Sequence, residues 1–176
     1  MMFATAARRG RFMRLRAPHD KTTTMRATGK TLDLEGVVAP GLGEGTRFTQ
    51  IGWVVDEFRR KLGFVPHPGT FNLRMGGAVW DRAVARLRAA AGIAIAPRDG
   101  FCAAKCFAVH VAGHLTGAVV FPEMLDYPYD KFEIVAPVPI RDTLGLRDGD
   151  LVEVRVDLVT PPRTGAPAAR PLQGAR

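Results

Sequence analysis

The sequence predicts a single-domain protein of mainly β-structure with helices (α+β), folded as a small mixed barrel. Short alternating apolar segments crowd the second half of the chain, whereas only two stretches repeat apolar residues at helical spacing. A doubly wound α/β sheet would need strands and helices in regular alternation, and the pattern lacks that order. The 176 residues are enough to bury one core.

The net charge of +8 is concentrated at the two ends of the chain. Residues 1–30 hold eight Lys and Arg but one acidic residue, and residues 159–176 hold three Arg and no acidic residue. Residues 31–158 contain 14 basic and 16 acidic residues. We expect a disordered basic extension over 1–30, the barrel domain over 31–158 and a disordered Pro/Ala/Gly-rich tail over 159–176. The near-neutral domain argues against nucleic acid as its partner.

The remaining composition predicts a cytoplasmic protein that does not enter membranes, and we expect it to be a monomer. No apolar run approaches the roughly 20 residues that a membrane helix needs. The N-terminal segment lacks the apolar stretch of a secretory signal. Two cysteines do not make a disulfide framework.

The first part of the domain alternates between strands and helices. Residues 31–40 have the alternation of a strand, and the glycine-rich loop 41–45 follows them directly. Apolar residues at helical spacing predict a helix over 50–62 and a second helix over about 80–91. Between these helices, a strand is predicted over 70–75.

The second part reads as strands joined by turns. The predicted strands cover 101–111, 115–121, 132–138 and 151–158. Ala112-Gly113 and Asp148-Gly149 supply the turns. Asp148-Gly149-Asp150 resembles a fragment of a calcium-binding loop, but the remaining ligands are missing, so we interpret it as a β-turn.

The sequence from Pro66 to Asn72, PHPGTFN, is the strongest chemical signal. Its prolines and glycine predict a tight turn that leads into a strand. Residues two apart on a strand face the same side, so Thr70 and Asn72 present two neutral oxygens together. Mg²⁺ accepts such ligands alongside phosphate oxygens. The upstream glycine-rich loop can offer backbone N–H groups to phosphates, so together the two segments predict a Mg²⁺–nucleotide site.

Two further side chains suit phosphoryl transfer. Glu133 lies in an otherwise apolar strand, where a carboxylate is costly unless it is hydrogen-bonded or faces a cavity. It could position or deprotonate an attacking hydroxyl, or be an ordinary exposed strand glutamate. Arg141 follows at a predicted helical turn, where it either clamps phosphate or makes a plain surface ion pair.

Cysteine and histidine are the usual zinc ligands, and four of them recur every four residues: Cys102, Cys106, His110 and His114. Four residues of strand cover about 13 Å, whereas zinc ligands all lie within about 2.3 Å of one ion. We therefore interpret them as core thiols and ordinary histidines.

With these residues assembled, the chain resembles the archaeal-type CTP-dependent riboflavin kinase family from about Leu34 to Leu158. Any one of the matching blocks is weak, but four occur in the same order. They are Glu35-Gly36-Val37-Val38 with Gly41–Gly45; Leu62–Pro66 with Pro68–Leu73; Gly117-Ala118-Val119-Val120; and Glu133–Pro137 with Ile140-Arg141 and Leu146–Asp150.

The resemblance implies a small closed cradle-loop β-barrel that transfers the γ-phosphate of CTP to the 5′-hydroxyl of riboflavin, giving FMN and CDP. It implies that Thr70 and Asn72 bind Mg²⁺ and that Glu133 contacts the flavin, where it is also the candidate catalytic group. The nucleotide-binding residues that it implies are Leu42, Gly43, Glu44, Gly45, Thr46, Arg47, Val138, Pro139, Ile140 and Arg141.

Two departures from the family lie on the acceptor side. Pro128 occupies an acceptor-binding position where the family has a small hydroxyl residue. The segment between Asn72 and Phe107 is longer and more helical than the family pattern. Two alternatives therefore stay open: the same chemistry on another small alcohol, or a non-catalytic barrel that binds DNA through its basic tails.

Overall fold

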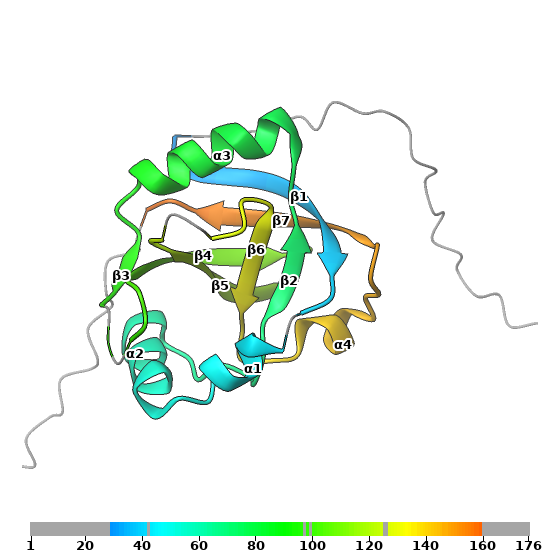
Figure 1. Cartoon of the computed structure of the whole chain (residues 1–176). Helices are drawn as coiled ribbons and strands as arrows, with labels where there is room; N and C mark the ends of the chain where they lie inside the picture. The colour runs from blue at the N-terminus through cyan, green and yellow to red at the C-terminus, as the bar shows by residue number, and fades with distance from the viewer. Residues whose placement is uncertain (1–28, 42, 97, 99, 125–126, 160–176) are drawn as a thin grey trace, which may run out of the picture.

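The computed structural model describes residues 29–41, 43–96, 98, 100–124 and 127–159. These residues form one barrel with helices at both ends (Figure 1). The predicted basic extension lies outside the described residues apart from Gly29 and Lys30, and the predicted tail lies outside them apart from Val159.

Six strands close the barrel and a seventh short strand extends it. The strands are β1 (Thr31–Ala39), β2 (Phe71–Arg74), β3 (Ile93–Ile95), β4 (Ala104–Val111), β5 (Leu115–Pro122), β6 (Lys131–Val135) and β7 (Leu151–Asp157). All neighbours pair antiparallel in the order β3-β4-β5-β6-β2-β1-β7, and β7 pairs again with the end of β4. The predicted closed barrel of mainly β-structure is therefore confirmed.

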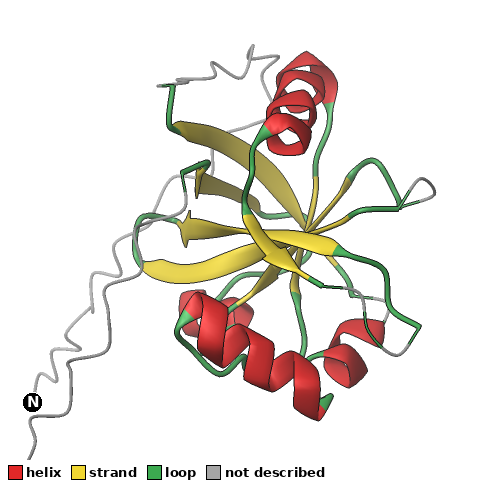
Figure 2. Cartoon of the chain, turned by 90° about the vertical axis from the view of Figure 1, so that its left-hand side faces the viewer, coloured by secondary structure: helices red, strands yellow, loops and turns green. Residues whose placement is uncertain are grey.

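Four helices occupy the ends of the barrel. They are α1 (Glu44–Phe48), α2 (Gly52–Leu62), α3 (Gly77–Ala89) and α4 (Ile140–Leu144). Both views place α3 across one end and the other three helices at the opposite end (Figures 1 and 2). In the described part of the chain, no helix is long and apolar enough to cross a membrane.

The structure differs from the sequence-based elements in several places. α1 begins at Glu44, inside the segment predicted as a loop, and its five residues are too few to show a helical period. β3 is a separate strand that we did not predict. β6 ends at Val135 instead of 138, because Pro137 and Pro139 have no N–H to continue a strand ladder.

Two apolar layers lie on the two faces of the barrel wall. The interior is filled from all six closing strands, and α3 covers its end with Trp80, Ala83, Val84 and Leu87. On the outer face of β4, β5 and β6, a second cluster packs Val54 and Phe58 of α2 against strand residues. Because strand side chains alternate, Glu133 lies on the same outer face as Val135 of this second cluster. The outer face beside α2 is where the candidate site lies.

Gly117 of β5 allows an unusually close strand contact. A Cβ atom at this position would lie 2.4 Å from the carbonyl oxygen of Val135. We therefore expect Gly117→Ala to lower the free energy of unfolding by about 1–3 kcal/mol, as overpacking does elsewhere. Urea denaturation followed by tryptophan fluorescence measures the loss.

Gly52→Ala is the matched control for this substitution. No atom lies within 4 Å of a Cβ built at Gly52, the first residue of α2. Alanine also favours the helix over glycine, so the free energy of unfolding should stay the same or rise slightly. Equal losses in the two variants would contradict the close-contact explanation.

Candidate functional site

Thr70, Asn72 and Glu133 converge on the outer face of the barrel. β2 and β6 pair so that Asn72 lies directly opposite Glu133. The Thr70 hydroxyl donates to Asn72 Oδ1 at 3.4 Å and to Glu133 Oε1 at 3.5 Å. Among the described residues, no three His, Cys, Asp or Glu side chains gather where they could hold a metal. A cation at this cluster would therefore rest mainly on the neutral oxygens of Thr70 and Asn72.

Asn72 is held so that its amide oxygen faces the cluster. The residue is only 5% exposed, and its Nδ2 group donates to the carbonyl oxygen of Thr70 at 3.1 Å. This bond uses the amide nitrogen and fixes the side-chain rotamer. The oxygen is left beside the Thr70 hydroxyl, as the two-residue spacing predicted.

The glycine-rich segment passes directly over this pair. A Cβ at Gly45 would lie 2.5 Å from Thr70 Oγ1, and one at Gly41 would lie 2.9 Å from Asn72 Nδ2. Gly43 has φ 83° and precedes α1, a conformation that favours glycine. The backbone at Gly41 and Gly45 therefore lies closer to the cluster than a residue with a side chain would allow.

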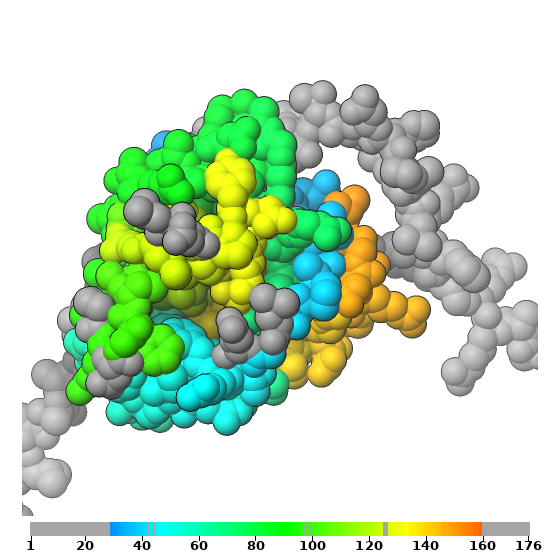
Figure 3. All heavy atoms as spheres, viewed as in Figure 1, coloured from blue at the N-terminus to red at the C-terminus, as the bar shows by residue number. Residues whose placement is uncertain are grey.

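The other residues of the predicted nucleotide loop are placed less fully. Leu42 lies outside the described residues, and Glu44 is placed only as the first residue of α1. Thr46 and Arg47 are exposed on α1. The space-filling view is hollowed between α1 and α2 on one side and the segment leading into β6 on the other (Figure 3).

Thr49 ties the glycine-rich segment to the turn that carries Thr70. This buried hydroxyl donates to the Gly45 carbonyl oxygen at 2.9 Å and accepts from the Gly69 N–H at 2.8 Å. Sequence analysis did not identify Thr49, because a single threonine after a five-residue helix carries no recognisable pattern.

The second predicted nucleotide stretch, 138–141, lines a cleft of about 190 Å³ that also includes Thr70 and His67. Arg141 pairs with Asp148 at 2.7 Å and donates to the carbonyl oxygen of Ala39 at 3.0 Å. Of the two alternatives for Arg141, the structure therefore contains the ion pair, while the side chain also remains on the wall of the cleft.

Two side chains that sequence analysis did not link to Glu133 bind its carboxylate. Tyr127 donates its hydroxyl to Oε2 at 2.5 Å, and the Lys131 ammonium lies 3.0 Å from Oε1. Lys131 also lies over the Tyr127 ring, 5.6 Å from its centroid. Burial and the hydrogen bond to Glu133 raise the pKa of the Tyr127 phenol, so it stays protonated and acts as a donor.

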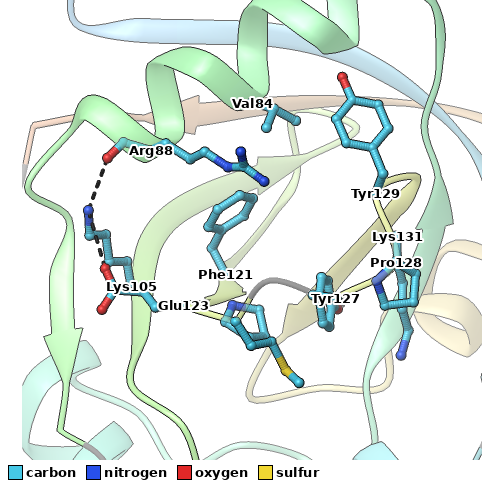
Figure 4. A pocket seen from close by; sticks show the side chains of 11 residues that line it. Val84, Arg88, Lys105, Phe121, Glu123, Tyr127, Pro128, Tyr129 and Lys131 are labelled. Atoms are coloured by element: carbon cyan, nitrogen blue, oxygen red, sulfur yellow. Dashed lines mark hydrogen bonds and ion pairs between the residues drawn. The ribbon is translucent and has the colours of Figure 1, made fainter.

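A larger pocket of about 370 Å³ begins beyond Tyr127 and Lys131 (Figure 4). It lies between α3 and the segment that joins β5 to β6, and Pro128 forms part of its wall. Since Tyr127 and Lys131 both line this pocket and both contact Glu133, they separate the pocket from the oxygen cluster.

The geometry defines a barrel with an oxygen cluster under a glycine-rich segment and a hollow on either side. Residues 38–156 match the family model CTP-dep_RFKase, described as "Domain of unknown function DUF120". The chain belongs to this family.

Curated relatives are riboflavin kinases of archaea. The chain is 41% identical over 128 residues to the riboflavin kinase of Methanosarcina barkeri, covering 71% of this chain and 56% of that protein. It is 39% identical over 136 residues to the riboflavin kinase of Archaeoglobus fulgidus, covering 73% of this chain and 56% of that protein. It is 38% identical over 133 residues to the riboflavin kinase of Pyrobaculum arsenaticum, covering 72% of this chain and 61% of that protein. The chain thus spans little more than half the length of the relatives it matches.

The hydrogen bonds that the Thr49 hydroxyl makes with Gly45 and Gly69 yield a stability prediction. Thr49→Val keeps the shape of the side chain but leaves the partly buried Gly69 N–H without its acceptor. We expect the free energy of unfolding to fall by about 1–3 kcal/mol. Chemical denaturation measures it.

Thr143→Val provides the comparison for Thr49. The Thr143 hydroxyl also donates to a carbonyl, that of Pro139 at 2.8 Å, but it is exposed. Water replaces that bond, so the change should stay within about 0.5 kcal/mol. A similar loss in both variants would show that Thr49 makes no special link.

Proposed function

We propose that this chain transfers the γ-phosphate of CTP to the 5′-hydroxyl of riboflavin, giving FMN and CDP. The observation that carries the proposal is the convergence of the Thr70, Asn72 and Glu133 oxygens beneath Gly41 and Gly45. The family name supports CTP as the donor, and the names of the curated relatives support riboflavin as the acceptor. A cytoplasmic location and a monomeric state remain part of this proposal.

Mg²⁺ fits the oxygens that the chain presents. Thr70 Oγ1 and Asn72 Oδ1 are hard neutral donors 3.4 Å apart. Mg²⁺ is commonly held by one or two protein oxygens, with phosphate oxygens and water completing its shell. We assign these two residues to the metal, which when bound would neutralise charge on the transferring phosphates.

The chain supplies the nucleotide with backbone and wall contacts. The glycine-rich segment brings main-chain N–H groups close to the cluster, where they can bind phosphate oxygens. The cleft formed by residues 138–141 adjoins Thr70 from the other side. We propose that CTP lies between these two walls, with its terminal phosphate at Thr70.

Glu133 is the proposed positioning group and base for the acceptor. The hydroxyl oxygen forms a bond to the γ-phosphorus, the bond from that phosphorus to the β-phosphate oxygen breaks, and CDP leaves. The hydroxyl proton passes to the Glu133 carboxylate. Tyr127 and Lys131 bind this carboxylate from the side of the larger pocket, so they hold it in position during the transfer.

Product analysis tests the reaction directly. Purified protein is incubated with riboflavin, Mg²⁺ and either CTP or ATP, and FMN is measured by chromatography. We expect FMN with CTP and little with ATP. Mg²⁺-dependent binding of CTP without FMN would point to another small alcohol as acceptor, and the absence of both would contradict the proposal.

Removing both assigned metal ligands tests the cluster. Thr70→Ala combined with Asn72→Ala should lower FMN formation at least about a hundredfold, because a metal supplies several kcal/mol to such a step. Circular dichroism should show the fold retained. Thr116→Ala, an exposed threonine of β5, serves as the control and should keep parental activity. Activity in the double variant close to the parent's would rule out the metal assignment.

A further inference from the structure

We propose that the outer face of β1 and β7 is a docking surface for the basic N-terminal extension of the same chain, which binds it through residues 11–16. The proposal is independent of the proposed function, because no residue of this face belongs to the oxygen cluster or lines either of the two cavities. It gives a partner to the Lys and Arg residues that are concentrated in residues 1–30.

The outward side chains of β1 and β7 form an acidic face. Every second residue of both strands is buried, so the residues between them point away from the barrel interior. Four carboxylates and a single arginine make up the charged groups of this face: Asp33, Glu35, Glu153, Asp157 and Arg155. The face is therefore negatively charged, and we call it the acidic face.

Two of the four carboxylates already have partners. Arg155 Nε donates to Asp33 Oδ1 at 2.6 Å. His110 of the neighbouring strand β4 places its Nε2 atom 3.4 Å from Asp157 Oδ2. The arginine of the face is thus engaged, and it cannot serve the remaining two carboxylates at the same time.

The other two carboxylates lie opposite each other. Glu35 pairs with Glu153 in the strand register, and both residues are exposed. Like charges directly opposite on neighbouring strands are destabilising. In the part of the chain that the structure describes, neither glutamate takes part in an ion pair. A cation from another segment would therefore relieve the repulsion between them.

An exposed apolar pair lies next to the two glutamates on the same face. Leu151 pairs with Val37, and each lies two residues along its strand from a glutamate of the pair. Leu151 is 64% exposed, more than any other large apolar side chain among the described residues. The segment that fits this face should therefore combine cations with apolar side chains.

Residues 11–16 of the extension have this combination. Their sequence is Arg11-Phe12-Met13-Arg14-Leu15-Arg16, three arginines interspersed with three apolar residues. Asp20 is the one acidic residue within 1–30, so the extension itself offers these arginines little competition. A guanidinium also matches a carboxylate with two parallel N–H donors.

The extension is long enough to reach the whole face of its own molecule. The chain enters β1 at Thr31, which pairs with Asp157 at one end of the face. Val37, at the other end, lies six strand residues away, a distance of about 20 Å. Arg16 precedes Gly29 by 13 residues, and an extended chain of that length spans up to about 43 Å. Docking within one chain is therefore possible without strain.

Proteolysis of the full chain measures the docking. Chymotrypsin cleaves after aromatic residues, and mass spectrometry follows the product that ends at Phe12. We expect Glu35→Lys combined with Glu153→Lys to make this cleavage about fivefold faster, since each exposed ion pair contributes modestly. Asp56→Lys combined with Asp130→Lys is the matched control, because it changes the charge equally at exposed carboxylates outside the face. The control should be cleaved like the parent, and circular dichroism should show both folds retained.

A charge exchange tests whether the two segments meet. A chain in which Arg11, Arg14 and Arg16 are replaced by Glu should be cleaved slowly after residue 12 only when Lys replaces both glutamates of the acidic face. The chains with and without these lysines share the same cleavage sequence, so the difference between their rates reports docking alone.

Three outcomes would overturn the proposal. The first is equal cleavage of the parent and the Glu35→Lys, Glu153→Lys variant. The second is protection that rises with protein concentration together with a larger species in gel filtration, which would place the extension on a second copy. The third is protection of the parent only when DNA is added, which would make nucleic acid the partner. FMN formation is not part of the readout, so this proposal and the proposed reaction can each fail alone.

Discussion

The antiparallel pairing of β7 with the end of β4 is the constraint on which the molecule depends. Val109 pairs with Val156 and Val111 with Val154, and these contacts close six strands into a ring. Closure gives each strand of the ring a partner on both sides and leaves none of the six as a free edge. β2 and β6 lie far from the seam, paired on both sides, so the position of Asn72 opposite Glu133 is fixed by a complete hydrogen-bonded network.

The closed barrel wall holds polar groups on its outer face, next to the apolar cluster under α2. α2 covers only part of the outer face, through Val54 and Phe58. The neighbouring part carries Asn72 and Glu133, each held by hydrogen bonds or ion pairs that offset the cost of removing polar atoms from water. The site is therefore built on strands, while the parts that cover it come from turns and a five-residue helix.

Sequence reasoning predicted what local pattern determines. Alternation gave most of the strands, the closed barrel was implied by the family resemblance, and the two-residue spacing placed Thr70 and Asn72 together. The same spacing would have placed Lys131 beside Glu133, but sequence analysis did not consider Lys131. The pairing of Asn72 with Glu133, and the bond from Tyr127, depend on strand register and on the path of a loop, which no local pattern encodes. Riboflavin and CTP came from the family resemblance, because side-chain chemistry alone indicates only a phosphate and an alcohol.

The pairing of β1 with β7 brings the first and the last strand of the barrel side by side. Thr31 pairs with Asp157, and the Leu158 N–H donates to the carbonyl oxygen of Lys30 at 2.9 Å. A linker of a few residues would therefore join these ends without crossing the site. The tight turn at Ala112-Gly113, distant in sequence from every residue of the oxygen cluster, offers a place for new termini. The barrel is thus suited to circular permutation, since its architecture depends on which strands are neighbours and not on where the chain starts.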